Sequence, residues 1–349
     1  MSISLDELQL AARNHGMPLE ALRHEITPLG LHYLLTHYDI PHVDAASWRL
    51  GVGGRVEREL ELSLDDLRAR EPVTMPVTME CAGNGRAELE PHVVSQPWLA
   101  EAVGTAEWTG TPVGSLLAEA GLQAAALEVV FTGLDRGVEG GVEQLYERSL
   151  SVADAERSLL AWGCNGEPLP PQHGFPLRLV VPGWYGMTSV KWLQRITVVS
   201  EPFDGYQMVT GYRMRRDEDD AGTPVTRIEP RSLMVPPGIP DFMTRRRFLP
   251  PGQVRLEGRA WSGWGPIELV ELNVDGGSWT PAKLGSPPGP AAWTPWSIDW
   301  QAVEGEHELR VRATDATGRR QPDAPPWNLG GYANNAVQRV AVTVTGLQD

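Results

Sequence analysis

The sequence predicts an α+β protein in two parts, a mixed α/β domain over residues 1–225 and a β-sandwich over residues 226–349. The chain has 349 residues, which is enough for two domains that each bury a core of their own. Short helical and strand patterns are mixed in the first part. From about Leu249 onward, apolar residues alternate with polar ones, which is the period of half-buried β-strands.

The composition predicts a soluble protein that binds neither nucleic acid nor membranes. Charged residues make up 21% and hydrophobic residues 41%, as in ordinary globular proteins. A formal net charge of −15 repels phosphate groups, so an anionic substrate would need a local basic pocket. The first residues show no leader pattern, and no apolar run approaches membrane-spanning length. We therefore expect a cytoplasmic protein.

Three elements are predicted before residue 70. Leucines spaced over residues 5–10 indicate a short amphipathic helix. Residues 48–52 alternate into the glycine pair 53–54, which predicts a strand and a turn. Ser63 and Asp66 have the spacing of a capping box, with Asp in place of the usual Glu, and predict a helix that begins here.

The next stretch predicts a strand that leads a cysteine into a glycine-rich loop. Apolar residues alternate with Thr and Pro over residues 73–79, and Cys81 is followed by Ala-Gly-Asn-Gly. Arg86 would help to hold the Cys81 sulfur as a thiolate, the form that attacks electrophiles or binds soft metals. The alternative is that Cys81 is a small apolar core residue, as most free cysteines are. Cys164 lies in an apolar stretch, and two cysteines do not make a disulfide framework.

The middle of the chain predicts a capped helix and a strand. Thr111 and Pro112 stand in the preferred order for a cap and a first-turn proline, and Gly121 ends the helix. Residues 128–132 read as a strand that ends in Gly-Leu-Asp, where Asp135 would ordinarily be a turn residue.

A basic loop after a buried strand predicts an anion site. Residues 177–181 form an apolar run that ends at Pro-Gly, and the loop beyond it carries Lys191. His173 and Arg178 flank a Gly-Phe-Pro turn, so both side chains can approach one anion such as a phosphate. Taken singly, Lys191 reads equally well as a surface lysine, His173 as a turn residue, and Arg178 as half of a salt bridge.

The last third of the chain predicts a connection and then a sandwich. Arginine, aspartate and proline clusters over residues 200–250 indicate an extended, irregular connection. Alternating segments follow at 254–256, 270–274, 307–313 and 340–344, with Asp275-Gly276-Gly277 as a hairpin turn. This spacing predicts an immunoglobulin-like β-sandwich.

Several of these segments resemble the sulfite oxidase family. Residues 80–86 resemble its Cys-Ala-Gly-Asn-Arg-Arg segment, and residues 33–41 resemble a loop that keeps the family's histidine at His37. The longest similar stretch runs from residue 159 to 198. Ala260–Gly263, Asp275–Gly277 and Pro326–Gly331 resemble the family's dimerisation domain. The resemblance covers nearly the whole chain, in order.

The resemblance implies a Mo-molybdopterin cofactor, one molybdenum per chain, in a domain of the sulfite oxidase type. By resemblance, Cys81 ligates the molybdenum, and Arg86 and Tyr212 act on the substrate. Cys164 takes the place of an apolar residue and is expected to pack in a core. The implied cofactor-binding residues are His37, Asp135, His173, Arg178, Ser189, Val190 and Lys191. The dimerisation domain implies a homodimer.

The expected reaction is oxidation of sulfite to sulfate by oxygen-atom transfer, with electrons passed to a separate acceptor. Two departures from the family's pattern bear on the substrate, because Leu35 and Pro266 stand where the family has arginines. The alternatives are the same chemistry on a sulfane, nitrate or an organic S- or N-oxide, or a non-catalytic cofactor carrier. A small oxyanion or sulfur compound is the expected substrate class.

Overall fold

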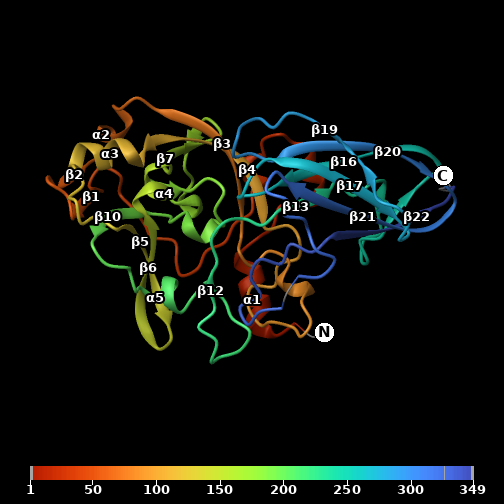
Figure 1. Ribbon diagram of the computed structural model, residues 1–349, viewed down its shortest axis with the longest axis horizontal. Coiled ribbons are helices and arrows are strands. Elements are labelled where there is room, and N and C mark those ends of the chain that lie inside the picture. Colours follow the sequence, from red (N-terminus) through yellow and green to blue (C-terminus); the bar gives the residue numbers. More distant parts are fainter. Residues whose placement is uncertain (1–2, 326, 347–349) are drawn as a thin grey trace.

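The computed structural model describes residues 3–325 and 327–346, so Pro326 of the Pro326–Gly331 motif lies outside the described residues. Two bodies lie side by side along the long axis (Figure 1). One body contains strands β1–β10, and the other is a β-sandwich that carries the C-terminus. Within the described ranges, no helix combines the length and apolar character needed to cross a bilayer.

The first body is built on one mixed sheet and one antiparallel sheet. One has the order β2-β1-β10-β5-β6, in which β1 and β10 are parallel and the other neighbours antiparallel. The other has the order β3-β4-β7-β8, with β9 paired to β7. The bounds are β1 Leu50–Gly54, β2 Leu60–Leu62, β3 Val73–Glu80, β4 Val103–Pro112, β5 Glu128–Glu139, β6 Val142–Ser151, β7 Leu159–Cys164, β8 Glu167–Pro168, β9 Arg178–Val180 and β10 Leu193–Val199.

The helices of this body are short. They are α1 Leu5–Arg13, α2 Leu64–Arg68, α3 Val113–Ala120, α4 Val152–Glu156 and α5 Tyr206–Val209. Short 3₁₀ helices span Leu19–Arg23, Leu29–Leu31, Arg86–Glu88, Pro171–His173 and Gly186–Thr188. The predicted capping box is confirmed, since the Asp66 N–H donates to Ser63 Oγ at 3.1 Å and the Ser63 N–H donates to Asp66 Oδ2 at 2.8 Å.

Two local predictions were wrong. Thr111 does not cap α3, because it belongs to β4 and its hydroxyl donates to the Leu67 carbonyl at 3.1 Å, which leaves Pro112 as the N-cap. The strand that begins at Glu128 does not end at Thr132 but continues to Glu139. Its register with β6 shifts between Thr132 and Arg136, so Asp135 lies in a bulge rather than in a turn.

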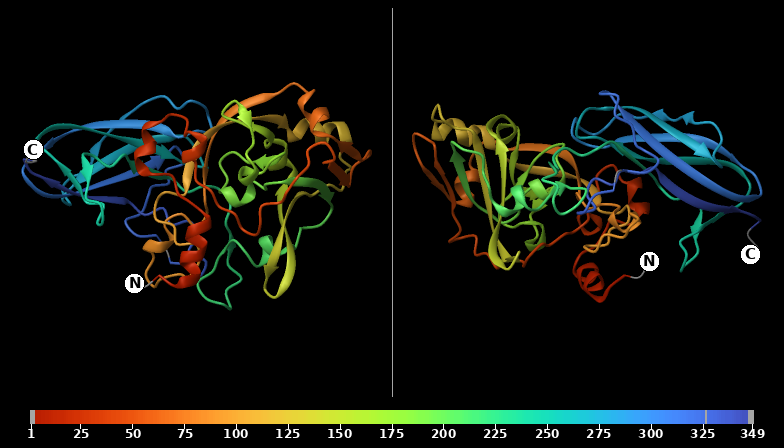
Figure 2. Two further views of the ribbon diagram at one scale, coloured as in Figure 1. Left: turned by 180° about the vertical axis from the view of Figure 1, so that it is seen from behind. Right: turned by 60° about the horizontal axis from the view of Figure 1, so that its bottom comes forward.

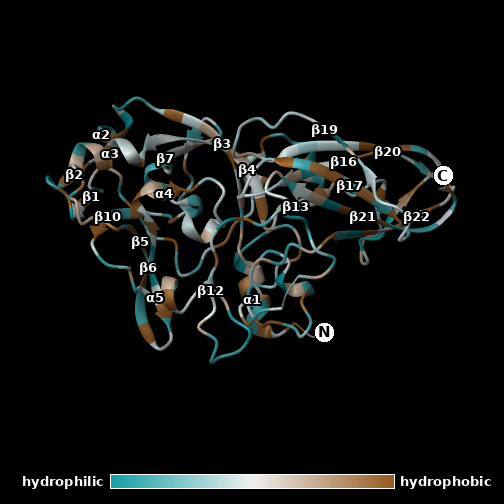
Figure 3. Cartoon of the chain, viewed as in Figure 1, coloured by the Kyte–Doolittle hydropathy of each residue, from teal (hydrophilic) through white to brown (hydrophobic). Residues whose placement is uncertain are grey.

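The second body confirms the predicted sandwich. Its sheets have the orders β13-β16-β20-β19 and β14-β15-β22-β21-β17-β18. The bounds are β13 Arg231–Met234, β14 Ile239–Pro240, β15 Arg247–Leu249, β16 Gly252–Trp261, β17 Ile267–Val274, β18 Thr280–Pro281, β19 Lys283–Leu284, β20 Thr294–Ala302, β21 Gly305–Asp315 and β22 Gln338–Val344. Figure 3 colours each residue by its hydropathy, and hydrophobic (brown) and hydrophilic (teal) residues both occur along the strands of the sandwich. Asp275 and Gly276 have positive φ angles of 52° and 71°, as the predicted hairpin turn requires.

The connection over residues 200–250 is more ordered than predicted. It forms α5, the hairpin of β11 Arg213–Met214 with β12 Thr223–Pro224, and strands that complete both sandwich sheets. The physical reason is that β13 and β15 gain ladder partners, β16 and β22, that lie far along the chain.

The two bodies are in extensive contact. Trp261 and Trp293 of the sandwich are buried in the same core as residues of the first body. The segment between β21 and β22 leaves the sandwich and lies against the first body near the loop after β3 (Figures 1 and 2). There Trp327 Nε1 donates to the Pro91 carbonyl at 2.8 Å.

Candidate active site

A cavity opens where β3, β5 and β9 meet the loops that follow them. The predicted residues Cys81, His37, Asp135, His173, Arg178, Ser189 and Lys191 all line it. Leu35, Met79, Tyr146 and Met187 contribute an apolar part of the lining. Residues from positions 32 to 191 are thus brought to one place, as the family resemblance implied.

Cys81 lies directly after the last residue of β3 and is buried. Its N–H donates to the Ala102 carbonyl at 2.9 Å, which holds the start of the loop against the neighbouring strand. Burial raises the pKa of the Cys81 thiol, and the nearby Arg86 guanidinium opposes that rise without reversing it. A β-carbon at Gly83 would collide with the Arg86 guanidinium, so a larger residue at this position would displace that side chain.

Arg178 and Lys191 form the cationic side of the cavity. Arg178 donates through Nη1 to the His173 carbonyl at 3.1 Å and through Nη2 to the Ser189 carbonyl at 3.3 Å. Lys191 Nζ donates to the Leu35 and Gln172 carbonyls at 2.8 and 3.0 Å. Burial lowers the pKa of both groups. Because each cation is held only by neutral carbonyls in these contacts, both are available to an anion.

Asp135 faces these cations from the bulge of β5. The side chain is buried, and its Oδ1 atom has no hydrogen-bond partner among the described residues. Burial raises the pKa of Asp135, while Lys191 opposes the rise. Burial also lowers the pKa of His37 to about 4, and lowers that of His173 below its ordinary value. At neutral pH both imidazoles are therefore uncharged hydrogen-bonding groups.

Two arginines enclose a pair of tyrosines beside the cavity. The rings of Tyr212 and Tyr332 lie 5.3 Å apart between centroids. The Arg148 guanidinium lies 5.5 Å from the Tyr212 ring centroid, and the Arg86 guanidinium lies 5.3 Å from that of Tyr332. We call Arg148, Tyr212, Tyr332 and Arg86 the arginine–tyrosine stack. The stack meets the cavity at His37, whose Nε2 shares a 2.7 Å hydrogen bond with the Tyr212 hydroxyl.

Neither arginine of the stack forms a salt bridge within the described residues. Arg86 donates through Nε to the Gly330 carbonyl at 2.9 Å and through Nη1 to the Gln96 carbonyl at 3.1 Å. Arg148 Nη1 donates to the Gln207 carbonyl, and its buried Nε has no partner in the described part of the chain. Two buried guanidinium charges without a carboxylate are unfavourable unless an anion approaches them.

Three predicted residues take positions of another kind. Arg86 and Tyr212 lie in the stack next to the cavity rather than in its lining. Val190 packs in the core, and its N–H and carbonyl are both bonded to backbone groups.

Two further residues lie away from the cavity. Cys164 packs in the core, as predicted, where burial raises its pKa to about 12. Pro266 precedes β17 in the sandwich and is not part of the lining.

The sequence did not identify Arg148, Tyr146 or Tyr332 as site residues. Tyr146 and Arg148 are two positions apart on β6 and therefore lie on the same strand face. An arginine and a tyrosine on one face of a strand are a detectable signal where that face is apolar, because a charged residue is rarely buried without a partner. Tyr332 carries no such signal, since its loop reaches the stack only through the contact between the two bodies.

Two protein families match the chain. The oxidoreductase molybdopterin binding domain matches residues 37–207, and the Mo-co oxidoreductase dimerisation domain matches residues 227–345. Together they cover most of the chain, one family on each body.

Named relatives include sulfite oxidases and nitrate reductases. The sulfite oxidase of Gallus gallus is 36% identical over an alignment of 350 positions, which spans 93% of this chain and 75% of the relative. The NADH nitrate reductase of Solanum lycopersicum is 32% identical over an alignment of 365 positions, which spans 95% of this chain but only 40% of the relative. The crystal structure of the sulfane dehydrogenase SoxCD from Paracoccus pantotrophus superimposes with a TM-score of 0.80 at 27% identity, covering 95% of this chain and 86% of that one.

The residues present fit Mo-molybdopterin. A buried Arg178 Nε and a buried Asp135 Oδ1 have no partner among the described residues, as expected of groups that bond a ligand with both donors and acceptors. The cations match a phosphate, and Cys81 supplies a soft sulfur ligand. From these matches and this geometry, we conclude that the chain belongs to the sulfite oxidase family and carries its molybdopterin-binding and dimerisation domains.

Proposed function

We propose that the protein oxidises sulfite to sulfate and passes the electrons to a separate acceptor. The observation that carries this proposal is the arginine–tyrosine stack, where two buried guanidinium groups without carboxylate partners lie beside the cavity that Cys81 lines. A dianion is the ligand that such a pair stabilises best. The cytoplasmic location and the homodimer remain predictions.

The cavity residues have distinct proposed roles. When bound, the cofactor supplies two-electron oxygen-atom transfer, and the protein orients it and the substrate. Cys81 provides the thiolate ligand to molybdenum. Arg178, Lys191 and the Ser189 region hold the cofactor's phosphate, while Asp135 accepts hydrogen bonds from the pterin. His37 and His173 remain neutral and add hydrogen bonds without adding charge.

Arg86 and Tyr212 are proposed to bind the substrate, with Arg148 behind Tyr212. Leu35 lines the cavity where the family has an arginine, so this loop contributes no charge. A charge-assisted contact is worth about 1.5–3 kcal/mol, so the loss of one is large enough to change substrate preference. Arg148, which comes from β6, offers a positive charge from a different element of the fold.

A sulfane is the second candidate substrate. Leu35, Met79 and Met187 make part of the cavity apolar, which favours a substrate with less charge than sulfite. The similarity to the sulfane dehydrogenase SoxCD is consistent with this alternative. Nitrate remains a third candidate because nitrate reductases are among the relatives.

A substrate panel on the molybdenum-loaded protein tests the proposal. Sulfite and thiosulfate are each added with an artificial electron acceptor, and nitrate is added with a reduced dye. We expect sulfite to give the highest kcat/KM. A preference for thiosulfate or nitrate would contradict the sulfite assignment, and turnover of none of them by fully loaded protein would contradict the proposed substrate class.

A further inference from the structure

The loop that carries Cys81 is held by the second body at several points. We define the Cys81 loop as residues 80–86, from the last residue of β3 to the first of a 3₁₀ helix. Four of its residues bond to groups from the sandwich or its connections. Besides Glu80, the contacts are the Ala333 N–H to the Ala82 carbonyl at 2.8 Å, Asn334 Nδ2 to the Gly85 carbonyl at 2.6 Å, and Arg86 Nε to the Gly330 carbonyl at 2.9 Å.

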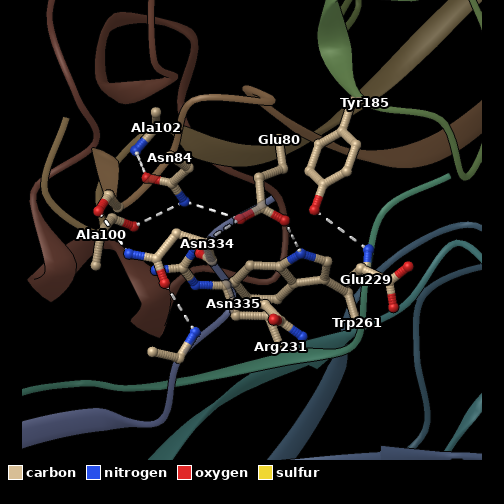
Figure 4. A network of polar contacts seen from close by, with 12 residues as sticks. Glu80, Asn84, Ala100, Ala102, Tyr185, Glu229, Arg231, Trp261, Asn334 and Asn335 are labelled. Carbon is tan, nitrogen blue, oxygen red and sulfur yellow. Dashed lines mark hydrogen bonds and ion pairs between the residues drawn. The ribbon is translucent and has the colours of Figure 1, made fainter. Parts of the chain in front are cut away.

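Glu80 is the centre of this contact (Figure 4). Its Oε1 atom accepts from Arg231 Nη1 at 3.0 Å and from Asn84 Nδ2 at 2.9 Å, and its Oε2 atom accepts from Trp261 Nε1 at 2.8 Å. The Glu80 and Arg231 side chains are only 2% and 3% exposed. A carboxylate this deeply buried needs hydrogen-bond donors and a positive charge beside it. The positive charge is that of Arg231, which belongs to β13 of the sandwich.

The first body also holds the loop, and it bonds Cys81 directly through the Cys81 N–H and the Ala102 carbonyl at 2.9 Å. There Asn84 Oδ1 accepts from the Ala102 N–H at 3.0 Å, and the Gly85 N–H donates to the Leu99 carbonyl at 2.7 Å. The loop has glycines at 83 and 85, which give its backbone more freedom than other residues would. The loop is therefore held by contacts from both bodies.

We propose that Arg231 and Glu80 are positioning residues for the Cys81 thiolate, so that the dimerisation domain forms part of the molybdenum site. Glu80 is the residue before Cys81, so the ion pair with Arg231 helps to hold the backbone from which the Cys81 side chain extends. This inference rests on the proposed role of Cys81 as the metal ligand. Substitution of groups that orient metal ligands typically lowers metal affinity or activity by about 10–100-fold.

The variant Arg231→Gln tests the proposal, with Arg247→Gln as its matched control. Arg247 is also a buried arginine of the second body that pairs with a glutamate of the first, since its Nη1 lies 3.1 Å from Glu20 Oε1. It does not contact the Cys81 loop. Both substitutions remove one positive charge and one contact between the bodies. Only Arg231→Gln removes a contact at the loop.

The readouts are molybdenum content, the Mo(V) spectrum and steady-state kinetics. We expect Arg231→Gln to lose molybdenum about 10–100-fold more readily on dialysis, to alter the Mo(V) spectrum, and to lower kcat with a smaller change in KM. Arg231→Lys keeps the charge and should recover part of the loss. Arg247→Gln should match the wild type in metal content and spectrum, and its melting temperature is measured to compare the loss of stability in the two variants.

A milder variant keeps the proposal testable if Arg231→Gln does not fold. Trp261→Phe removes the indole N–H that donates to Glu80, together with one ring of a buried side chain, and leaves the Glu80–Arg231 ion pair in place. It should change the Mo(V) spectrum in the same direction. Folded Arg231→Gln or Trp261→Phe with wild-type metal retention and spectrum would overturn the inference. A separate measurement tests the premise. If Cys81→Ser kept the molybdenum content and Mo(V) spectrum of the wild type, the proposed role of Cys81 on which this inference rests would be refuted.

Discussion

At the scale of single residues, the two cysteines have different environments. Cys81 lines the cavity, whereas Cys164 packs against apolar residues in a core. Burial raises the pKa of both thiols, so neither is expected to be a thiolate until a metal compensates its charge.

The first prediction concerns these cysteines. Cys81→Ser should abolish turnover and change the Mo(V) spectrum, because serine provides no thiolate. Cys164→Ser should leave both nearly unchanged, although it places a hydroxyl in a core and should lower the melting temperature. Metal analysis, spectroscopy and thermal unfolding measure these effects. Equal loss of activity in both fully folded variants would contradict the assignment of Cys81 as the ligand.

The second prediction concerns the charge beside the substrate. Arg148→Gln should raise the KM for sulfite by about tenfold or more, because one charge-assisted contact is lost. Leu35→Arg should lower that KM by roughly tenfold or more in the wild type, and should restore it in Arg148→Gln, by supplying a charge from the other side of the cavity.

The control for this prediction is Arg136→Gln. Arg136 is on the same pair of strands but is exposed, where it pairs with Glu143 at 3.2 Å. The Arg136→Gln variant loses the same net charge but keeps the arginine–tyrosine stack intact. Its KM for sulfite should therefore equal that of the wild type. If Arg148→Gln and Arg136→Gln behave alike with full metal content, Arg148 does not contribute to substrate binding.

At the scale of elements, the hairpin turn after β17 contains a pH-dependent contact. His307 of β21 shares a 2.7 Å hydrogen bond through Nδ1 with Asp275 Oδ2, and the Glu308 N–H donates to Asp275 Oδ1 at 2.8 Å. The hydrogen bond with Asp275 raises the pKa of His307.

The third prediction follows from the direction of that shift. A histidine whose pKa is raised in the folded state adds stability that is fully present below its unfolded pKa and is lost as the pH rises through the folded pKa. His307→Gln should therefore lower the melting temperature more at pH 5.5 than at pH 8.5. The difference is expected to be about 1–3 °C, since the pair is near the surface. An equal loss at both pH values would show that the charge of His307 does not stabilise the turn.

At the scale of the whole molecule, the sandwich has an apolar projection. The hairpin of β14 and β15 extends away from the second body (Figure 2). At its tip Phe242 is 85% exposed and Met243 is 81% exposed. Large exposed apolar side chains side by side are typical of a surface that contacts another chain.

The fourth prediction is a homodimer formed through the second body. Light scattering at micromolar concentration should give twice the mass of one chain. Replacing both Phe242 and Met243 by serine should weaken the dimer, because the buried apolar area decreases. Val138→Ser is the control, since this residue is 71% exposed but belongs to the first body. A wild-type monomer would refute the dimer, and an unchanged dimer in the double variant would place its interface elsewhere.

Much of the fold and site was predictable because local patterns and family spacing determine it. The alternation before Cys81 indicated β3, the spacing of Ser63 and Asp66 indicated the start of α2, and alternating segments indicated the sandwich. Each of these signals depends on neighbours within a few residues along the chain, so no knowledge of distant contacts was needed. Seven predicted cofactor and metal residues line one cavity, and their prediction rested on the resemblance to the sulfite oxidase family.

The remaining features depend on contacts between distant segments. Thr111 bonds to Leu67 instead of capping α3, and β5 passes Asp135 because β6 pairs with its far half. The arginine–tyrosine stack joins positions 86, 148, 212 and 332, and Glu80 meets Arg231 across the two bodies. The sequence alone thus determined the family, the cofactor and the element that carries Cys81. Only the tertiary structure decided which charges surround the substrate and what holds the loop, because packing of the two bodies brings those residues together.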